Sequence, residues 1–434
     1  MLQYREQYNS TILEFADLNF EGKKEIYFSK RREDSLCFSL SKRRGVNCHL
    51  ITSYFVGIDI IPDIKVPIYI EPKLNATRKE NESNTNEIET DYLRMLFDAL
   101  RHNDIANKYV EDLFEIKWDK TFIEIDQKQD LLTPLLVVQF LNVVQQIVRK
   151  GLKKSYYKVE QNLNSRIKGK VLVGKTIKQN LTKNRLLNTY CSYDEFGINT
   201  LENRLIKKAL DFVRRYLPSL QIPNSYEYTA QIFNYIMPAF EQVSEEVNLN
   251  DIKHTKTNVF YREYEEGVRL ARIILKRFGY NISNTERIKI KTPPFWIDMS
   301  KLYELYVLAK LKDKFGHEVE YQFHANYGQP DYILNSQKII IDAKYKPYYN
   351  KAFNKNDDQK REIIVSDIRQ VSGYARDKKV REKLNAENDE VLACLIIYPD
   401  LTKADNFMDR EILEEKIEQF EKFWKIGIKL PLIK

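Results

Sequence analysis

The feature that most constrains this chain is a hairpin-like stretch in its last quarter. An apolar run, Ile339–Ile341, is followed by Asp342 and, two residues later, by Lys344. Successive side chains of a strand point to opposite faces, so Asp342 and Lys344 share one face while the residue between them points into the packing. If residues 335–336, Asn-Ser, form the corner of a hairpin, Asp331 returns beside Asp342. The stretch therefore predicts a hairpin that brings two carboxylates and one ammonium group together.

Two carboxylates beside a lysine supply the groups needed for metal-assisted hydrolysis of a phosphodiester. Hard divalent ions such as Mg²⁺ or Mn²⁺ favour carboxylate oxygens and keep waters and phosphate oxygens in their shell. We expect the ion between Asp331 and Asp342, with the Ala343 carbonyl as a possible further ligand, and Lys344 orienting and helping to deprotonate the attacking water. Such a short pattern also occurs by chance in a chain of this length. Residues 62–73 match the same pattern of an aspartate followed by an acid and a lysine two residues apart.

A helix expected before the hairpin supports the C-terminal copy of the pattern. Ser300 can cap this helix, which has an apolar side and ends near Gly316. Glu304 lies in its first turns and is a candidate third acidic ligand. In the copy at residues 62–73, Pro72 removes a donor from the strand, and a polar segment follows. We therefore interpret the acids of that copy, Asp63 and Glu71, as scaffold.

A helix and a strand expected after the hairpin complete a compact unit. Ser366 begins the helix, and Gln370 and Tyr374 lie four residues apart on one of its faces. An apolar strand follows at residues 391–398. Helix, strand, strand, helix and strand predict an α/β unit with the acids at strand ends.

These motifs resemble a known family. Residues 329–398 are similar to the PD-(D/E)xK nuclease core, and Gln370 with Tyr374 resembles the QxxxY element of its RecB-like branch. Six further segments resemble the McrC family, the nuclease subunit of modification-dependent McrBC restriction systems, namely residues 131–136 (LLTPLL), 148–152 (VRKGL), 167–170 (IKGK), 193–196 (YDEF), 201–204 (LENR) and 297–299 (IDM). The resemblance covers most of the chain and is weakest before about residue 40.

The resemblance implies an endonuclease that acts with a separate motor. That motor is McrB, a GTP-dependent AAA+ ring, whose GTP hydrolysis this chain would stimulate. Asp331, Asp342 and Lys344 stand where the family has its catalytic residues. Further positions carried over from the family are Glu304, Asp367 and Gln370. The expected substrate is modified, typically methylated, double-stranded DNA chosen by the partner, and no nucleotide is expected to bind to this chain itself.

Composition indicates a soluble chain of two or three domains. The 434 residues are 43% hydrophobic and 30% charged, and no apolar run approaches the roughly 18 residues of a membrane span. The N-terminus lacks the apolar core of an export signal, and the four cysteines form no Cys-x-x-Cys pair. We therefore expect a cytoplasmic protein without structural zinc or disulfides.

Four segments are expected, which together make a multidomain α/β protein. Residues 1–75 contain short strand-like runs and predict a β-rich domain that, by the resemblance, engages the motor. Residues 76–90 have almost nothing to bury and predict a mobile linker or loop. Residues 91–290 are expected to be mainly helical, and residues 291–434 to form the PD-(D/E)xK, restriction-endonuclease-like α/β core. Candidates for an arginine that acts on the partner's phosphates are Arg31, Arg32, Arg43 and Arg44.

The helices expected in the middle segment carry apolar stripes and no ligand cluster. Thr133 is expected to cap one of them, with Pro134 at its first position. Others are expected at residues 201–217, 228–243 and 259–278. We interpret these helices as packing elements.

Positive charge is concentrated between Arg149 and Arg185. This stretch has twelve Lys or Arg and one acid, Glu160, so its net charge exceeds the +8 of the whole chain. Tyrosines interrupt it, as is typical of surfaces that contact a phosphate backbone. The candidate DNA-binding residues are Lys150, Lys153, Lys154, Lys168, Lys170 and Lys175. A solvated basic face and a docking surface for an acidic protein remain alternatives.

Residues 169–176 fit the P-loop expression G-x-x-x-x-G-K-[ST]. A P-loop follows a buried apolar strand and opens a helix, so that its amides cradle phosphates. Here the preceding residues 162–168 are polar and basic, and the Val-Leu-Val at 171–173 favours a strand. Three hypotheses therefore stand, in this order: a metal-dependent endonuclease subunit, a DNA-binding motor adaptor whose nuclease fold is unused, and a nucleotide switch at Gly169–Thr176.

Overall fold

The computed structural model describes most of the chain and divides it into two compact units. The first is Met1–Leu135 together with Arg287–Lys434, and the second is Leu136–Glu286. The expected division into four functional segments stays a prediction. The described residues are 1–12, 20–28, 35–43, 48–61, 64–72, 90–109, 113–126, 130, 132–216, 225–247, 262–279, 289–346, 349, 358–400 and 407–432. Arg31, Arg32, Arg44, Asp63 and nearly all of the expected linker, residues 76–89, lie outside them.

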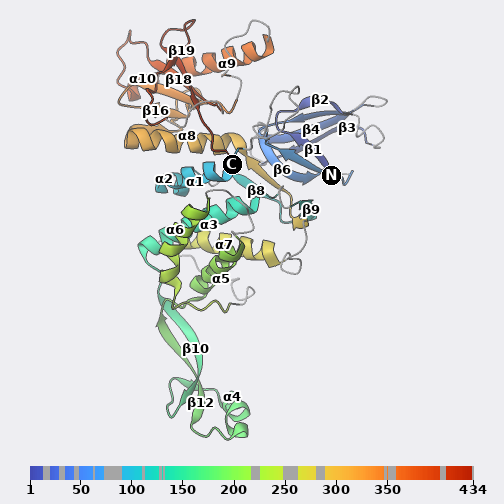
Figure 1. Ribbon diagram of the computed structural model, residues 1–434, viewed down its shortest axis with the longest axis vertical. Coiled ribbons are helices and arrows are strands. Elements are labelled where there is room, and N and C mark those ends of the chain that lie inside the picture. Colours follow the sequence, from blue (N-terminus) through green and yellow to red (C-terminus); the bar gives the residue numbers. More distant parts are fainter. Residues whose placement is uncertain are drawn as a thin grey trace. The chain divides into compact units, whose positions relative to one another are not determined.

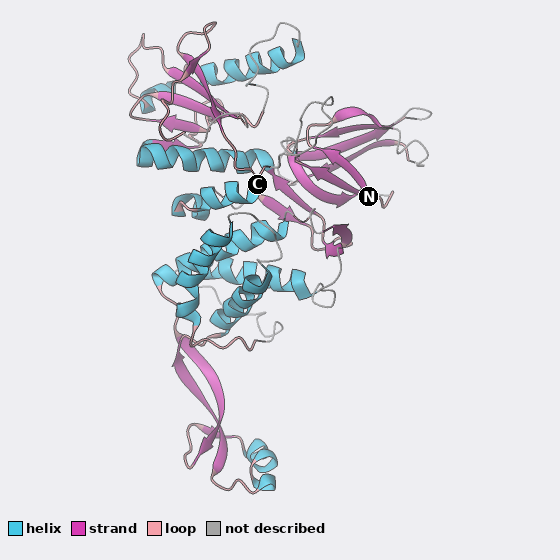
Figure 2. Ribbon diagram, in the orientation of Figure 1, coloured by secondary structure: helices cyan, strands magenta, loops and turns pink. Residues whose placement is uncertain are grey.

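The first unit begins with two β-sheets, which confirms a β-rich N-terminal region (Figures 1 and 2). A five-stranded sheet has the order β1-β7-β6-β14-β8, and a four-stranded sheet has the order β2-β5-β4-β3. Their buried side chains form one core that includes Phe38, Ile68 and Trp296. The strands are β1 (Leu2–Arg5), β2 (Asn9–Ile12), β3 (Gly22–Tyr27), β4 (Leu36–Lys42), β5 (Cys48–Thr52), β6 (Phe55–Ile60), β7 (Pro67–Glu71), β8 (Phe114–Ile116) and β14 (Phe295–Asp298).

Strand β14 is distant in sequence from the other strands of its sheet and pairs antiparallel with β6 and with β8. Gly57 of β6 permits this approach, because a Cβ there would lie 2.0 Å from the Phe295 carbonyl oxygen. Beside it, the Trp296 indole N–H donates to Asp59 at 3.0 Å in the buried core. The pairing ties the N-terminal sheet to helix α8 (Met299–Phe315), which follows β14 directly.

The N-cap of helix α8 lies two positions before the residue expected from the sequence. The Asp298 side chain accepts a hydrogen bond from the Lys301 backbone N–H at 2.9 Å, so Asp298 is the N-cap. The prediction of Ser300 as the cap is wrong, because Ser300 lies within the first turn. The helix ends as expected at Gly316, whose φ is +60°. Other elements of this unit are α1 (Tyr92–Leu100), α2 (Asn103–Lys108), η9 (Gly316–Glu318) and the paired strands β9 (Ile123–Asp126) and β13 (Lys289–Thr292).

The C-terminal part of the first unit is a six-stranded sheet of order β15-β16-β17-β18-β20-β19. The predicted hairpin is confirmed, because β16 and β17 pair antiparallel with Tyr332 opposite Ile341. Strand β18 then runs parallel to β17 and β20. Helices α8 and α9 lie along the sheet (Figure 1). The elements are β15 (Val319–Tyr321), β16 (Tyr332–Leu334), β17 (Ile339–Ala343), α9 (Asp358–Tyr374), α10 (Lys378–Lys383), β18 (Ala393–Pro399), β19 (Glu415–Lys416) and β20 (Phe423–Ile428).

Helix α9 is longer than the sequence pattern indicated. It begins at Asp358, whereas the expected start was Ser366. Ile364 precedes that expected start and is already buried against the sheet, in one core with Ile368 and Ile396. Apolar packing therefore extends the helix across a stretch whose local composition is mostly polar.

The second unit is built on the expected helices. Its core helix α3 is long and apolar enough to cross a membrane, but 83% of its apolar window is buried inside the protein, as in a core helix. The prediction that Thr133 caps α3 is wrong, because Asp130 accepts from the Thr133 N–H and hydroxyl. The helices are α3 (Leu132–Lys150), α5 (Leu201–Tyr216), α6 (Ser225–Ile236), η5 (Met237–Phe240) and α7 (Arg262–Gly279).

A long β-hairpin interrupts the segment that was expected to be mainly helical (Figures 1 and 2). Strands β10 (Ser155–Asn164) and β12 (Asn188–Gly197) pair antiparallel along their full length, and β11 (Lys170–Val171) adds a third strand. Their connection carries α4 (Val173–Gln179) and η3 (Leu181–Lys183), in which no residue is buried. Because most side chains of the hairpin are exposed or half-buried, no apolar alternation marks these strands in the sequence.

Candidate active site

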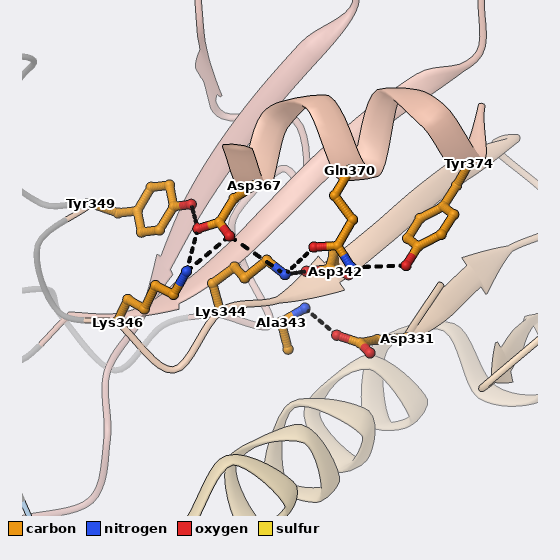
Figure 3. Close-up of polar contacts among 9 residues, drawn as sticks. All are labelled: Asp331, Asp342, Ala343, Lys344, Lys346, Tyr349, Asp367, Gln370 and Tyr374. Atoms are coloured by element: carbon orange, nitrogen blue, oxygen red, sulfur yellow. Dashed lines mark hydrogen bonds and ion pairs between the residues drawn. The ribbon is translucent and has the colours of Figure 1, made fainter. Parts of the chain in front are cut away.

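The hairpin of β16 and β17 places two carboxylates side by side (Figure 3). Asp342 lies in β17 with 2% of its surface exposed. Asp331 directly precedes β16, and its Oδ2 accepts a hydrogen bond from the Ala343 backbone N–H at 2.7 Å. Burial and the neighbouring charges of Asp342 and Glu304 raise the pKa of Asp331 well above its ordinary value. The juxtaposition expected from the sequence is therefore present.

Lys344 faces the same carboxylates. Its Nζ lies 2.7 Å from Asp342 Oδ2 and 3.8 Å from Asp367 Oδ1, and it donates to Gln370 Oε1 at 2.9 Å. Burial alone would lower the pKa of Lys344, but Asp342 and Asp367 raise it above the ordinary value. In this arrangement the lysine keeps its proton, so it serves as a positive charge and a hydrogen-bond donor.

Helix α9 supplies the partners that hold this lysine. The Gln370 side chain accepts from Lys344, and its Nε2 donates to the Tyr374 hydroxyl at 2.9 Å. The expected common face of Gln370 and Tyr374 is confirmed by this contact. Tyr374 is itself buried in the core between α9 and the sheet. A continuous polar chain thus links the lysine to the packed interior (Figure 3).

Glu304 approaches the two aspartates from helix α8. Its Oε2 accepts a hydrogen bond from the Tyr321 hydroxyl at 3.0 Å. Burial and the charge of Asp298 raise the pKa of Glu304 to about 7, while the Tyr321 hydroxyl opposes that shift. Glu304 also raises the pKa of Asp331, so Glu304 and the two aspartates form one electrostatic group. The role of Glu304 as a third acidic ligand stays a prediction.

Sequence reasoning missed part of the surrounding network. Asp367 accepts from Lys346 Nζ at 2.7 and 2.8 Å and from the Tyr349 hydroxyl, so it balances a second lysine beside the first (Figure 3). The signal was present, because Lys346 follows Lys344 at the two-residue spacing of a strand face. Tyr321 gave no such signal, because it lies in a three-residue strand.

The donor chemistry of this cluster fits a hard divalent ion. Among the described residues, no three His, Cys, Asp or Glu side chains converge tightly enough to form a complete cage. Mg²⁺, however, commonly binds through one or two carboxylates plus waters and substrate phosphates. Asp342 Oδ2 is buried and has only the ion-pair contact with Lys344, with no hydrogen bond of good geometry. Asp331 and Asp342 therefore suit an ion that the substrate helps to hold.

The candidate DNA-binding lysines lie in the second unit, and most of them are paired with acids. Lys153 contacts Glu202 at 2.8 Å, and Lys168 contacts Glu195 at 3.0 Å. Lys175 contacts Glu160 at 2.9 Å, and Lys150 pairs with Glu263. Within the described part of the chain, Lys154 and Lys170 are exposed and have no such partner.

Residues 169–176 do not have the backbone arrangement of a P-loop. Gly169 is needed for close packing, because a Cβ there would lie 2.5 Å from the Ser192 carbonyl oxygen of β12. The following strand β11 is antiparallel to β12 and only two residues long. The expectation of a strand through Val173 is wrong, because α4 begins there. The Lys175 ammonium is held by Glu160.

One protein family matches most of this chain. Residues 52–399 match the family described as McrBC 5-methylcytosine restriction system component. A solved assembly of Thermococcus gammatolerans McrB AAA+ hexamers with bound McrC is similar at 15% identity and a TM-score of 0.33, covering 90% of this chain and 80% of that one. The cryo-EM McrBC complex of the same organism is similar at 14% identity and a TM-score of 0.30, covering 84% of this chain and 99% of that one. No curated protein matches.

Proposed function

Because this chain belongs to the family of McrBC 5-methylcytosine restriction system components, we propose that it is an McrC-type endonuclease subunit. It hydrolyses phosphodiesters of modified double-stranded DNA in a metal-dependent reaction, and it works with an McrB-like, GTP-dependent AAA+ ring. The observation that carries this proposal is the convergence of Asp331, Asp342 and Lys344 on one hairpin, with Lys344 Nζ 2.7 Å from Asp342 Oδ2.

The acids would hold Mg²⁺ or Mn²⁺. Asp331 and Asp342 are the proposed ligands, with Glu304 beside them. The bound ion supplies positive charge that stabilises the negative charge developing on the scissile phosphate. Without it, neighbouring carboxylates repel one another in a mostly buried site. Burial raises the pKa of all three acids, and nearby carboxylates raise it further, namely Asp342 and Glu304 for Asp331 and Asp367 for Asp342.

Lys344 orients the attacking water and stabilises the reacting phosphate. Its Nζ donates to Gln370 Oε1 at 2.9 Å, so the ammonium is fixed rather than free to rotate. Because Asp342 and Asp367 keep it protonated, its role in the resting protein is that of a donor. Gln370 and Tyr374 position the lysine and need not touch the substrate.

The N-terminal region is proposed to engage the motor ring and stimulate its GTP hydrolysis. Its sheets offer a stable body for that role. Arg43, exposed just after β4, is the one candidate phosphate-directed arginine among the described residues. The chain itself is proposed to bind no nucleotide, which fits the antiparallel packing of Gly169 and β11.

A second candidate is a DNA-binding motor adaptor whose nuclease site is unused. The unpaired Lys154 and Lys170 are the observation in its favour. The adaptor hypothesis predicts that the acidic cluster is not needed for function. Several mutually repelling acids in a mostly buried site, however, destabilise the fold, and a catalytic role explains why they are present.

The test uses the complete complex. Modified plasmid DNA is incubated with the ring partner, GTP and Mg²⁺, and with wild-type chain, Asp342→Ala or Lys344→Ala, and GTP hydrolysis is measured in the same tubes. We expect both variants to lose cleavage while they retain partner binding and stimulated GTP hydrolysis. Variants that cut like the wild type would reject the nuclease assignment and leave the adaptor.

A further inference from the structure

The loop that leads into Asp331 presents one fully exposed aromatic ring. Tyr327 is 89% exposed. Its loop is nevertheless fixed, because the Asp377 carboxylate accepts from the backbone N–H groups of Asn326 at 2.9 Å and Tyr327 at 3.3 Å. The Asn326 side-chain amide donates to the same carboxylate at 3.1 Å. Because the loop is already ordered, binding a ligand to the exposed ring would cost less backbone conformational entropy.

The next residue in this loop packs against the network that holds Lys344. Gly328 has a φ of +92°, and a Cβ at that position would lie 2.8 Å from the Tyr374 ring. Tyr374 accepts from Gln370, and Gln370 accepts from Lys344. The loop therefore has a defined position relative to the reacting centre. Tyr327 and Asp331 are four positions apart in the sequence, so their Cα atoms are at most about 14 Å apart.

Positive charge lies next to this loop. Arg376, Lys378 and Lys379 flank Asp377 in sequence, and all three are exposed. Within the described residues, none of their side chains has an acidic or hydrogen-bonding partner. Asp377 itself is engaged by the loop backbone and by the Lys379 backbone N–H at 2.9 Å. An aromatic ring bordered by unpaired cations is the arrangement found where proteins bind exposed nucleotides.

We propose that Tyr327, Arg376, Lys378 and Lys379 form a nucleotide-binding patch at the mouth of the active site. The Tyr327 ring stacks on an unstacked nucleobase of the strand being cut, a few nucleotides from the scissile phosphate, and the three cations contact flanking phosphates. This inference rests on the proposed nuclease function, because it assigns the patch to the same DNA. A ring stacks on any base, so the contact adds affinity without reading sequence.

The patch is tested on the full chain in EDTA, with fluorescence anisotropy of three labelled probes: a single-stranded oligonucleotide, the corresponding duplex, and an oligonucleotide whose residues are all abasic. Tyr327→Ala is expected to weaken binding to the single strand by about 5- to 100-fold, the range of one base–aromatic stack. Tyr327→Phe keeps the ring and should stay within about twofold of wild type. The control Tyr235→Ala removes another exposed tyrosine, on α6, and should leave all affinities unchanged.

The abasic probe separates stacking from charge. Wild type and Tyr327→Ala should bind the abasic probe with equal affinity. Arg376→Ala/Lys379→Ala should lower the affinity for all three probes. It should also reduce the slope of log affinity against log salt by about 0.7 to 0.9 for each phosphate that is no longer neutralised. If Tyr327→Ala binds the single strand as tightly as wild type does, the proposal is overturned. If this variant instead binds the motor ring more weakly, the patch contacts a protein. Asp342→Asn is assayed for cleavage in parallel. If it is inactive while Tyr327→Ala binds normally, only the patch is wrong; if it still cuts, the nuclease function itself fails.

Discussion

The C-terminal cluster and the β10–β12 hairpin both contain lysines beside carboxylates, but their charge balance is opposite. At the cluster, two lysines face at least four acids, and Asp342 and Asp367 are buried. On the hairpin, the ion pairs Lys168–Glu195 and Lys175–Glu160 are largely exposed, and Lys170 has no acidic partner among the described residues. An excess of buried negative charge calls for a cation, whereas exposed ion pairs contribute little to stability. The difference distinguishes the proposed active site from a solvated surface.

The hairpin also offers apolar surface that the cluster lacks. Eight of its large hydrophobic side chains are 47–75% exposed, namely Tyr156, Ile167, Val173, Ile177, Leu181, Leu186, Leu187 and Phe196. Helix α4 buries none of its residues. The sequence count of positive charge was a poor guide to the stretch between Arg149 and Arg185, since four of its six candidate lysines pair with acids, three of which lie outside that stretch.

Asp331→Asn should have the largest effect, and it should lower activity while raising stability. Cleavage by the complex is expected to fall by about 10³-fold, as when a charged group at a reacting centre is removed. In EDTA at pH 8 the same variant should melt roughly 3 °C higher, the shift that about 1 kcal/mol gives in a domain of this size. Burial and neighbouring charge raise the folded-state pKa of Asp331, so its ionisation destabilises the fold as the pH rises above about 3.9.

The matched control for this variant is Asp194→Asn, an exposed acid of strand β12. It should change neither cleavage nor melting temperature. Mg²⁺ should stabilise the wild type and the control but not Asp331→Asn, as followed by thermal melting with increasing metal. A variant at Asp331 that melts lower than wild type in EDTA would show that repulsion among the acids is not what distinguishes the two regions.

Gln370→Leu should have an intermediate effect. It removes the acceptor of the Lys344 ammonium while keeping the volume of the side chain, and we expect kcat for cleavage to fall by about tenfold. Tyr374→Phe removes only the next hydroxyl in the chain and should cost less, about two- to threefold. The readout is single-turnover cleavage at saturating Mg²⁺. If Tyr374→Phe costs more than Gln370→Leu, the order Tyr374, Gln370, Lys344 does not describe how the lysine is held.

Sequence patterns predicted the cluster better than the hairpin for a physical reason. Ile339–Ile341 must be buried, and burial on both faces fixes the strand, its register and hence the position of Asp342. Strand β10 has no fully buried face, so its sequence shows no apolar alternation. Its residues Lys158 and Glu160 therefore indicated only the charge of the segment and not its structure. Tyr321 was missed because contact with Glu304 depends on how a short strand packs on α8, which no local pattern encodes.

The lysines of the hairpin give a smaller, salt-dependent effect. Lys154→Ala/Lys170→Ala removes the two unpaired candidates, and we expect DNA affinity to fall several-fold and the slope of log affinity against log salt to drop by about 0.9 for each phosphate that is no longer neutralised. Lys168→Ala/Lys175→Ala removes two paired lysines and should change the slope less. The comparison is made with one duplex between 50 and 200 mM salt. Equal slopes for the two double variants would mean that ion pairing does not decide which lysines reach DNA.

Glu202→Gln should have the smallest effect, on stability alone. Burial tends to raise the pKa of Glu202, but Lys153 and the backbone N–H of Glu202 hold it below its ordinary value. The stabilisation is therefore present above the unfolded pKa of about 4.3 and is lost as the pH falls through the lower folded value. We expect Glu202→Gln to lower the melting temperature of the full chain by about 2 °C at pH 7, and by progressively less below pH 4.3. Glu195→Gln, whose carboxylate and partner Lys168 are both exposed, should show no shift at either pH. A Glu202→Gln difference that persists unchanged at pH 4 would trace the stabilisation to hydrogen bonding and not to charge pairing with Lys153.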